Sequence, residues 1–244
     1  MEPTIIFEDS DFLVIEKPAG FIVNKADTSV GQKTIQEWAD KYLKLSENSP
    51  IDTNGDFFKR SGIVHRLDKE TSGLLLLAKS KGAFEELQRQ FKQGEVEKEY
   101  IALAHGTVKP EEGEINVPIG RLPWNRMRFG IIPQGRESRT LYKVLSNHKL
   151  KQQSRVDAFS LVEVYPKSGR THQIRVHFQY IGNPLFADAL YAGRKTIKRD
   201  RKILSRHFLH AGKILFNHPT SGIRLKFESP LPQDLKDLIS KLSV

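Results

Sequence analysis

A cluster of charged residues stands directly before a continuous apolar run in residues 62–80, GIVHRLDKETSGLLLLAKS. Six consecutive positions hold five titratable side chains, His65, Arg66, Asp68, Lys69 and Glu70. Arg66 and Lys69 flank Asp68 and favour its ionised form. A loop held between two buried strands can present such a carboxylate rigidly as a nucleophile or a general base. A lone aspartate is more often a turn or cap residue, so this loop alone does not establish catalysis.

A second stretch whose residue types could take part in binding or catalysis is GRTHQIRVH, residues 169–177. Arg170 falls at the start of a predicted helix and Arg175 lies further along it. Guanidinium groups near a helix N-terminus favour an anion, although a solvated basic helix face would look the same. His172 and His177 are five residues apart, which places them on different faces, and no acidic residue joins them. The stretch therefore does not predict a metal site.

Two further basic stretches are candidates for contact with nucleic acid. Residues 121–130, RLPWNRMRFG, interleave arginines with Trp124 and Phe129, a pattern suited to stacking on bases while contacting phosphates. Residues 193–202, GRKTIKRDRK, form a predicted phosphate-contacting loop. Either stretch could instead be a structural or merely solvated loop. The candidate contacts in them are Arg121, Arg126, Arg128, Arg194, Lys195, Lys198 and Arg199.

The composition limits the class of protein. The chain has 244 residues, a net charge of +10 and no cysteine. A basic chain of this kind favours polyanionic partners, because binding releases condensed counterions. No apolar run approaches the roughly 18 residues that span a bilayer, and the acidic start does not resemble a signal peptide. We therefore expect a cytoplasmic protein without disulfides, and no nucleotide-binding loop or serine-hydrolase elbow is present.

The elements that must position these residues are mostly strands. Strands are predicted in a hairpin over 4–24 and over 62–65, 73–80, 99–108, 139–145, 158–165, 208–216 and 223–229. Helices are predicted over 34–43, 82–93, 171–181 and 232–242, and a polar surface loop over 46–61. Consecutive strands favour an α+β fold with a mixed, mostly antiparallel sheet and flanking helices. The Gly- and Pro-containing stretch 108–137 is the expected division between two halves.

Local patterns refine three of these elements. Thr34 with Glu37 predicts a capping box at a helix start. Alternation along 99–108 places Tyr100, Ala102 and Ala104 on one face. In the helix over 171–181 an apolar stripe opposes a polar face formed by His172, Arg175 and Gln179.

The sequence resembles the RluA family of RNA pseudouridine synthases in several ordered blocks. GIVHRLDKETSGLLLLAKS is similar to the family signature, and VIEKPAGFIV (14–23) to its opening block. VEKEYIALAHG (96–106) resembles the block with the active-site tyrosine. GRTHQIRVHFQYIGNPLFADALY (169–191) resembles the arginine block, and HFLHAGKILFNHP (207–219) the block near the C-terminus. The blocks are spread over most of the length of residues 5–230.

The resemblance implies an enzyme that isomerises uridine to pseudouridine in ribosomal or transfer RNA. It carries the catalytic aspartate onto Asp68, the tyrosine onto Tyr100 and the arginine that pairs with the aspartate onto Arg170. The arginine that can fill the gap left by a flipped nucleotide corresponds to Arg66. Further candidate RNA contacts are His65, His172 and Arg175.

The resemblance also implies one catalytic domain over 1–244, with a central RNA-binding cleft. The part that resembles the catalytic domain begins near residue 4, so we expect no N-terminal S4-type domain. Whether the aspartate attacks C1′ or removes a sugar proton stays open. The reaction transfers no group and changes no oxidation state, so no cofactor or metal is expected. RNA is the expected partner, with no membrane and no obligate protein partner, and a monomer is expected.

Two other functions compete with this prediction. A non-catalytic RNA-binding or RNA-folding protein could use the same scaffold, but such a protein would be expected to have lost Asp68, Tyr100 or Arg170. A hydrolase with Asp68 as its nucleophile is disfavoured by the basic charge and by the lack of partner motifs.

Overall fold

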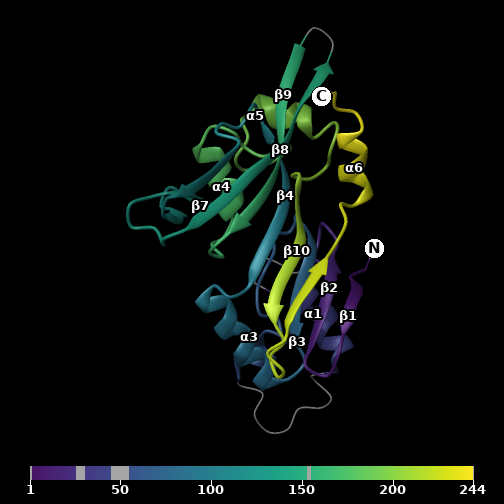
Figure 1. Ribbon diagram of the computed structural model, residues 1–244. Helices are drawn as coiled ribbons and strands as arrows, with labels where there is room; N and C mark the ends of the chain where they lie inside the picture. The colour runs from purple at the N-terminus through teal and green to yellow at the C-terminus, as the bar shows by residue number, and fades with distance from the viewer. Residues whose placement is uncertain (1, 26–30, 45–54, 153–154, 244) are drawn as a thin grey trace. The chain divides into compact units, whose positions relative to one another are not determined.

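The structure is a computed structural model that describes residues 2–25, 31–44, 55–152 and 155–243. The chain forms two compact units (Figure 1), the first from Met1–Glu97 and Lys213–Ser229, the second from Lys98–Gly212 and Pro230–Val244. The stretch 108–137 is therefore not the division that was expected from the sequence. It lies inside the second unit because its strand β5 (Glu112–Asn116) pairs with β8 (Arg139–Gln152).

The first unit is built on a sheet in which β1 (Thr4–Glu8), β2 (Phe12–Lys17) and β3 (Ser72–Ala78) are successive neighbours. The next strand is β10 (Leu209–Asn217), which also pairs with β11 (Arg224–Glu228). All seven residues of β3 are buried. A strand that is apolar at nearly every position suits a sheet covered on both faces, and here it anchors the loop that carries Asp68.

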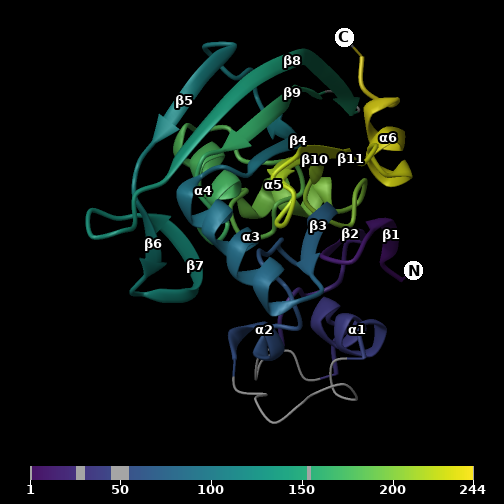
Figure 2. The same cartoon turned by 60° about the horizontal axis from the view of Figure 1, so that its bottom comes forward.

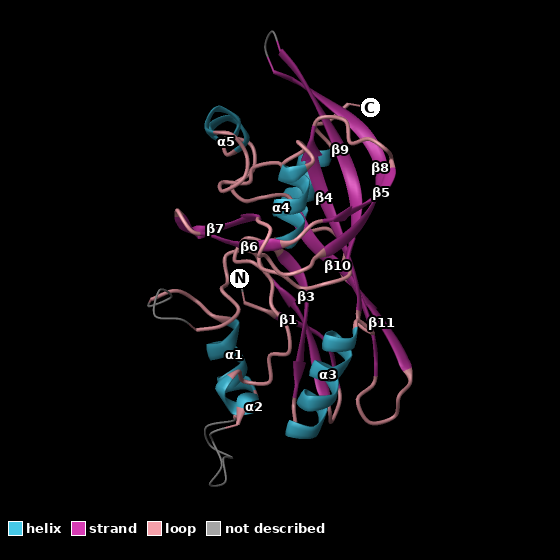
Figure 3. Cartoon of the chain, turned by 90° about the vertical axis from the view of Figure 1, so that its left-hand side faces the viewer, coloured by secondary structure: helices cyan, strands magenta, loops and turns pink. Residues whose placement is uncertain are grey.

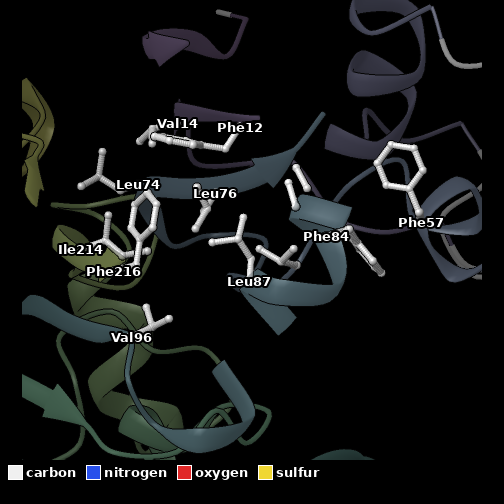
Figure 4. Packing of buried hydrophobic residues seen from close by; sticks show 13 residues of the cluster. Phe12, Val14, Phe57, Leu74, Leu76, Phe84, Leu87, Val96, Ile214 and Phe216 are labelled. Atoms are coloured by element: carbon white, nitrogen blue, oxygen red, sulfur yellow. The ribbon is translucent and has the colours of Figure 1, made fainter. Parts of the chain in front are cut away.

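The described part of the first unit contains the helices α1 (Ile35–Tyr42), α2 (Asp56–Lys59) and α3 (Lys81–Gln93). Thr34 caps α1 as predicted, because its hydroxyl accepts a hydrogen bond from the Glu37 N–H at 3.1 Å. Figure 4 shows Phe84 and Leu87 of α3 in one apolar cluster with Leu76 of β3.

The predicted surface loop over 46–61 is only partly within the described residues, because 45–54 fall outside them. The described part includes the short helix α2 (Asp56–Lys59) instead of a loop. The reason is Phe57, which is 5% exposed and makes an edge contact with the ring of Phe84, 5.8 Å between centroids. Burial of this aromatic ring holds the helical turn against the core.

The second unit contains a sheet with the strand order β10-β4-β9-β8-β5, where β4 is Glu97–His105 and β9 is Arg155–Pro166. The chain enters and leaves this unit within β4 and β10. A separate two-stranded sheet is formed by β6 (Ile119–Leu122) and β7 (Asn125–Ile131). The pairs β1–β2, β2–β3, β4–β9, β5–β8, β8–β9 and β10–β11 are antiparallel, which confirms the predicted α+β class.

The helices of the second unit are α4 (Gln173–Tyr180), α5 (Arg194–Asp200) and α6 (Gln233–Ile239). Figure 3 shows α4 and α5 on the same side of β4 and β9. Leu235 and Leu238 of α6 pack into a cluster with Leu103 and Phe208. In the described part of the chain, none of these helices has the length and apolar character needed to cross a bilayer.

Candidate active site

The loop that carries Asp68 lies directly before β3 and is tied to it. The Thr71 N–H donates to the Asp68 carbonyl at 3.1 Å and closes a turn. His65 Nε2 accepts a hydrogen bond from the Leu76 N–H at 3.0 Å, and its ring stacks on Phe91 at 4.7 Å. Asp68 itself is half-buried. The buried apolar strand β3 therefore holds the charged loop in place, as the sequence pattern suggested.

A buried lysine holds the other side of the same loop. Lys17 is 0% exposed, and its ammonium donates to the carbonyls of Pro18 at 3.0 Å, Phe21 at 3.0 Å and Lys69 at 3.2 Å. The Lys69 carbonyl also accepts from the Gly20 N–H at 2.8 Å. These bonds join the turn after β2 to the residue next to Asp68.

The two RNA-binding candidates of this loop differ in their surroundings. Arg66 is exposed, as a residue that reaches into RNA must be. The ring of His65 accepts a hydrogen bond from the Leu76 N–H and stacks on Phe91, so these contacts within the unit are structural.

Tyr100 lies on β4 in the second unit and is 8% exposed. It pairs with Val164 of β9, while Ala102 and Ala104, both fully buried, follow it on the same face. The small side chains of Ala102 and Ala104 add little bulk beside Tyr100 on the C-terminal side of its own strand. Two residues earlier, Lys98 points to the Ser168 carbonyl at 3.5 Å, and burial together with the charge of Lys167 lowers the pKa of Lys98 to about 8.

Arg170 stands in the turn between β9 and α4, also in the second unit. Its Nε donates to the Glu137 carbonyl at 3.0 Å, and its backbone N–H donates to Gln173 Oε1 at 3.0 Å. Burial and the neighbouring Arg136 lower the pKa of the Arg170 guanidinium, and Glu137 partly offsets this. An arginine stays charged in spite of such a shift, so Arg170 offers a fixed cation.

Arg175 does not fit its predicted role as an RNA contact. It is 5% exposed and pairs with the fully buried Asp188, with Nε–Oδ2 at 2.7 Å and Nη2–Oδ1 at 2.9 Å. Burial opposes ionisation of Asp188, but the hydrogen bonds and charge of Arg175 leave the pKa of this carboxyl below its usual value. Arg175 on the predicted polar face is thus covered, because Asp188 pairs with it, whereas Gln179 on the same face is exposed.

His172 and Tyr191 join this internal cluster. His172 has a left-handed backbone with φ +57°, and its Nδ1 lies 2.9 Å from the Tyr191 hydroxyl. The same hydroxyl accepts from the Phe129 N–H at 3.1 Å, and the guanidinium of Arg128 lies over the Tyr191 ring at 5.4 Å. The base of the β6–β7 hairpin is therefore bound to α4 and to the segment before α5.

The basic–aromatic stretch 121–130 forms the β6–β7 hairpin, not a loop (Figure 2). Its arginines divide into two groups. Arg128 bonds the Leu190 carbonyl and faces inward, whereas Arg121 and Arg126 are exposed. Trp124, at the turn, is 78% exposed, so the outer end of the hairpin presents an aromatic plane beside two cations.

The basic stretch 193–202 also differs from the predicted loop, because most of it forms α5. Its single acidic residue, Asp200, is buried, accepts from the Ala187 N–H at 3.0 Å and lies 2.8 Å from His105 Nε2. This anchor leaves Arg194, Lys195 and Lys198 exposed, while Arg199 is half-buried near Asp157.

A family model described as RNA pseudouridylate synthase matches residues 11–180. The chain belongs to this family. The RNA pseudouridine synthase YlyB of Bacillus subtilis is 38% identical over 242 residues, 99% of this chain and 73% of that protein. Ribosomal large subunit pseudouridine synthase D of Nitrosomonas europaea is 36% identical over 242 residues, 98% of this chain and 64% of that protein. The chain thus spans 64–73% of these curated relatives.

The solved structure of human RNA Pseudouridylate Synthase Domain Containing 1 is similar at a TM-score of 0.71 and 28% identity. The match covers 99% of this chain and 88% of that chain. These findings confirm the resemblance drawn from the motifs. As a member of the RNA pseudouridylate synthase family, the chain is an RNA-modifying isomerase.

Sequence reasoning missed the residues that hold the synthase motifs in place: Lys17, Gln173, Asp188 and Tyr191. Lys17 carried a signal, because a lysine at the end of a mostly apolar strand and before Pro-Ala-Gly is unusual in a core. Asp188 and Tyr191 lie inside a family-like block but carried no local pattern that distinguishes a buried partner from an exposed one.

Proposed function

We propose that this synthase isomerises uridine in structured RNA, with large-subunit ribosomal RNA as the first substrate to test. The observation that carries the proposal is the complete signature loop around Asp68, fixed by a fully buried Lys17 and by β3. The ribosomal substrate is suggested by the name of the Nitrosomonas europaea relative. Transfer RNA is the alternative substrate within the same proposal.

In the proposed reaction the C1′–N1 bond breaks, C1′ bonds to C5, C5 loses its proton and N1 gains one. Atoms and electrons balance within the RNA and one exchanged proton, so no cofactor is required. Asp68 begins as an anion and either attacks C1′ or removes a sugar proton; both routes release the uracil. The uracil stacks on the ring face of Tyr100, and the Tyr100 hydroxyl can transfer the C5 proton.

Arg170 retains the role that the resemblance assigns to it, a fixed guanidinium for an anionic partner in the reaction. The target base must leave its stack, at a cost of a few kcal/mol. Arg66, which is exposed, would fill the vacated place. The exposed cations of the hairpin and of α5 would contact phosphates, and the enzyme would act in the cytoplasm without an obligate protein partner.

The test is Asp68→Asn, which keeps the size of the side chain and removes its charge. We expect no pseudouridine in a large-subunit ribosomal RNA transcript, measured by tritium release from [5-³H]uridine, with RNA affinity within about twofold of wild type. Turnover by this variant would refute the role of Asp68. A wild-type protein that binds the transcript and bulk transfer RNA but modifies neither would instead support the non-catalytic RNA-binding function.

A further inference from the structure

The turn that carries Arg170 depends on one buried side-chain amide. Gln173 is 4% exposed, and its Oε1 accepts from the Arg170 N–H at 3.0 Å and from the Ser168 hydroxyl at 2.7 Å. Its Nε2 donates to the Arg139 carbonyl at 3.0 Å and to the Thr140 hydroxyl at 2.9 Å. Two acceptor and two donor positions are thus used, which is the full capacity of an amide.

The backbone between Arg170 and Gln173 is held in an unfavourable conformation. His172 has φ +57° and ψ +21°, a left-handed geometry that residues with a Cβ rarely adopt. Such strain persists only where surrounding contacts enforce it, and it is concentrated at functional sites. Here the Gln173 amide on one side and the Tyr191 hydroxyl, 2.9 Å from His172 Nδ1, on the other enforce it.

The same turn is braced from two more directions. The Lys98 ammonium reaches the Ser168 carbonyl at 3.5 Å, and the Arg170 Nε is held by the Glu137 carbonyl at 3.0 Å. Backbone and side chain of Arg170 are therefore both set before any RNA arrives. Preorganised charge of this kind lowers the barrier of a reaction more than it strengthens substrate binding.

We propose that Gln173 is a positioning residue for the isomerisation, which acts by fixing the Arg170 guanidinium and touches neither RNA nor the reacting atoms. The proposal rests on the proposed function. It assigns to Gln173 an effect on kcat, because RNA binding is distributed over other, exposed cations.

The first unit supplies a matched control. Gln90 is 0% exposed, and its amide donates to the Asn217 carbonyl at 2.9 Å and accepts from the Asn217 N–H at 2.9 Å. It ties α3 to β10 far along the chain from Arg170. Gln90→Met and Gln173→Met each remove a buried amide of equal size and leave backbone groups without their partner, so both are expected to lower the Tm by several degrees.

The experiment compares kcat and KM of wild type, Gln173→Met, Gln173→Glu and Gln90→Met on a large-subunit ribosomal RNA transcript, below the Tm of each. For Gln173→Met we expect kcat to fall at least tenfold with KM within about threefold. Gln173→Glu retains both acceptor positions and is expected to recover part of kcat. Gln90→Met is expected to keep wild-type kcat.

Two outcomes overturn the inference while the proposed function stands: equal kcat for the two Met variants, or a loss at Gln173 that appears only in KM. A Gln173→Glu variant no better than Gln173→Met also contradicts positioning through the Arg170 N–H. If wild type itself forms no pseudouridine in the transcript or in bulk transfer RNA, the proposed function fails first, and Gln173 is then only a structural residue.

Discussion

Each unit fixes the loop of a predicted catalytic residue with a buried polar side chain, but the two side chains differ in charge. In the first unit the Lys17 ammonium, fully buried, binds three carbonyls that include the residue next to Asp68. In the second unit the neutral Gln173 amide binds the backbone N–H of Arg170. An ammonium only donates hydrogen bonds, whereas an amide both donates and accepts them.

The difference fits the charge that each loop carries. In the first unit the buried ammonium of Lys17 lies at the carbonyl of the residue after Asp68. In the second unit the buried amide beside Arg170 is neutral and adds no further repulsion to that of Arg136. The second unit also buries charged groups, among them the pair Arg175 and Asp188 and the ammonium of Lys98 at the Ser168 carbonyl. The comparison predicts that the units respond differently to loss of a charge, to acid and to salt.

The largest effect on stability is expected from breaking the buried pair of the second unit. Asp188→Ala leaves the Arg175 guanidinium buried without its carboxylate, which costs about 4 kcal/mol of the free energy of unfolding. The double variant Arg175→Met/Asp188→Leu removes both charges and is expected to lose much less. Urea unfolding measures both, and a double variant as unstable as the single one would show that the cost is packing, not charge.

Lys17→Met tests the buried cation of the first unit. The carbonyls of Pro18, Phe21 and Lys69 lose a charged donor, so we expect the free energy of unfolding to fall by about 3 kcal/mol. Pseudouridine formation should fall too, because the loop of Asp68 loses its support. Lys79→Met is the control, since Lys79 pairs with Glu8 at 2.7 Å but is partly exposed, and is expected to cost less than about 1 kcal/mol.

Acid is expected to weaken the neutral network of the second unit. His177 is fully buried, its Nδ1 lies 2.9 Å from Thr140 Oγ1, and burial lowers its pKa to about 4, with a partial offset from the Val117 carbonyl. An unfolded histidine titrates near pH 6.5. Between these values the unfolded chain binds the proton and the native chain does not, so stability falls as pH decreases.

The whole effect of His177 amounts to about 3 kcal/mol between pH 6.5 and 4. His177→Gln should flatten the pH dependence of stability in this window, measured by urea unfolding at several pH values. Equal pH slopes for wild type and variant would contradict the assignment of the titration to His177.

The sequence predicted the elements whose pattern is local. The Thr34 cap, the buried run of β3 and the alternation around Tyr100 all follow from neighbours within a few residues. The burial of Arg175 could not be predicted in this way. The spacing of Arg175 with His172 and Gln179 indicated a polar helix face. Arg175 is buried because tertiary packing brings Asp188, which is later in the sequence, into contact with it.

The candidate site shows the same limit. Motifs located Asp68, Tyr100 and Arg170, but the side chains that fix their loops are Lys17 and Gln173, which bond to residues distant in sequence or to backbone atoms. Every residue type offers a backbone carbonyl, so a hydrogen bond to the backbone cannot be recognised from the pattern of side-chain types. Residues 121–130 and 193–202, predicted as loops, form a hairpin and a helix. Hydrogen bonds of Tyr191 and Asp200 attach these two elements to the rest of the unit.

The smallest effect is expected at the surface that would meet RNA. Trp124→Ala with Arg126→Ala removes the exposed ring and one cation at the hairpin end, and should weaken RNA binding by about 1–2 kcal/mol. Loss of one phosphate contact should reduce the slope of log affinity against log salt by about 1. Substituting Arg194, Lys195 and Lys198 by Ala should reduce the slope further.

The matched control for these surface variants is Lys226→Ala in the first unit, an exposed cation that pairs with Glu228 at 2.6 Å. Its salt slope should equal that of wild type, measured by fluorescence anisotropy on the same transcript. A lower slope for Lys226→Ala and an unchanged slope for the hairpin and α5 variants would place the RNA on the first unit. The second unit would then hold only the predicted catalytic residues Arg170 and Tyr100, and the exposed hairpin would be a solvated surface.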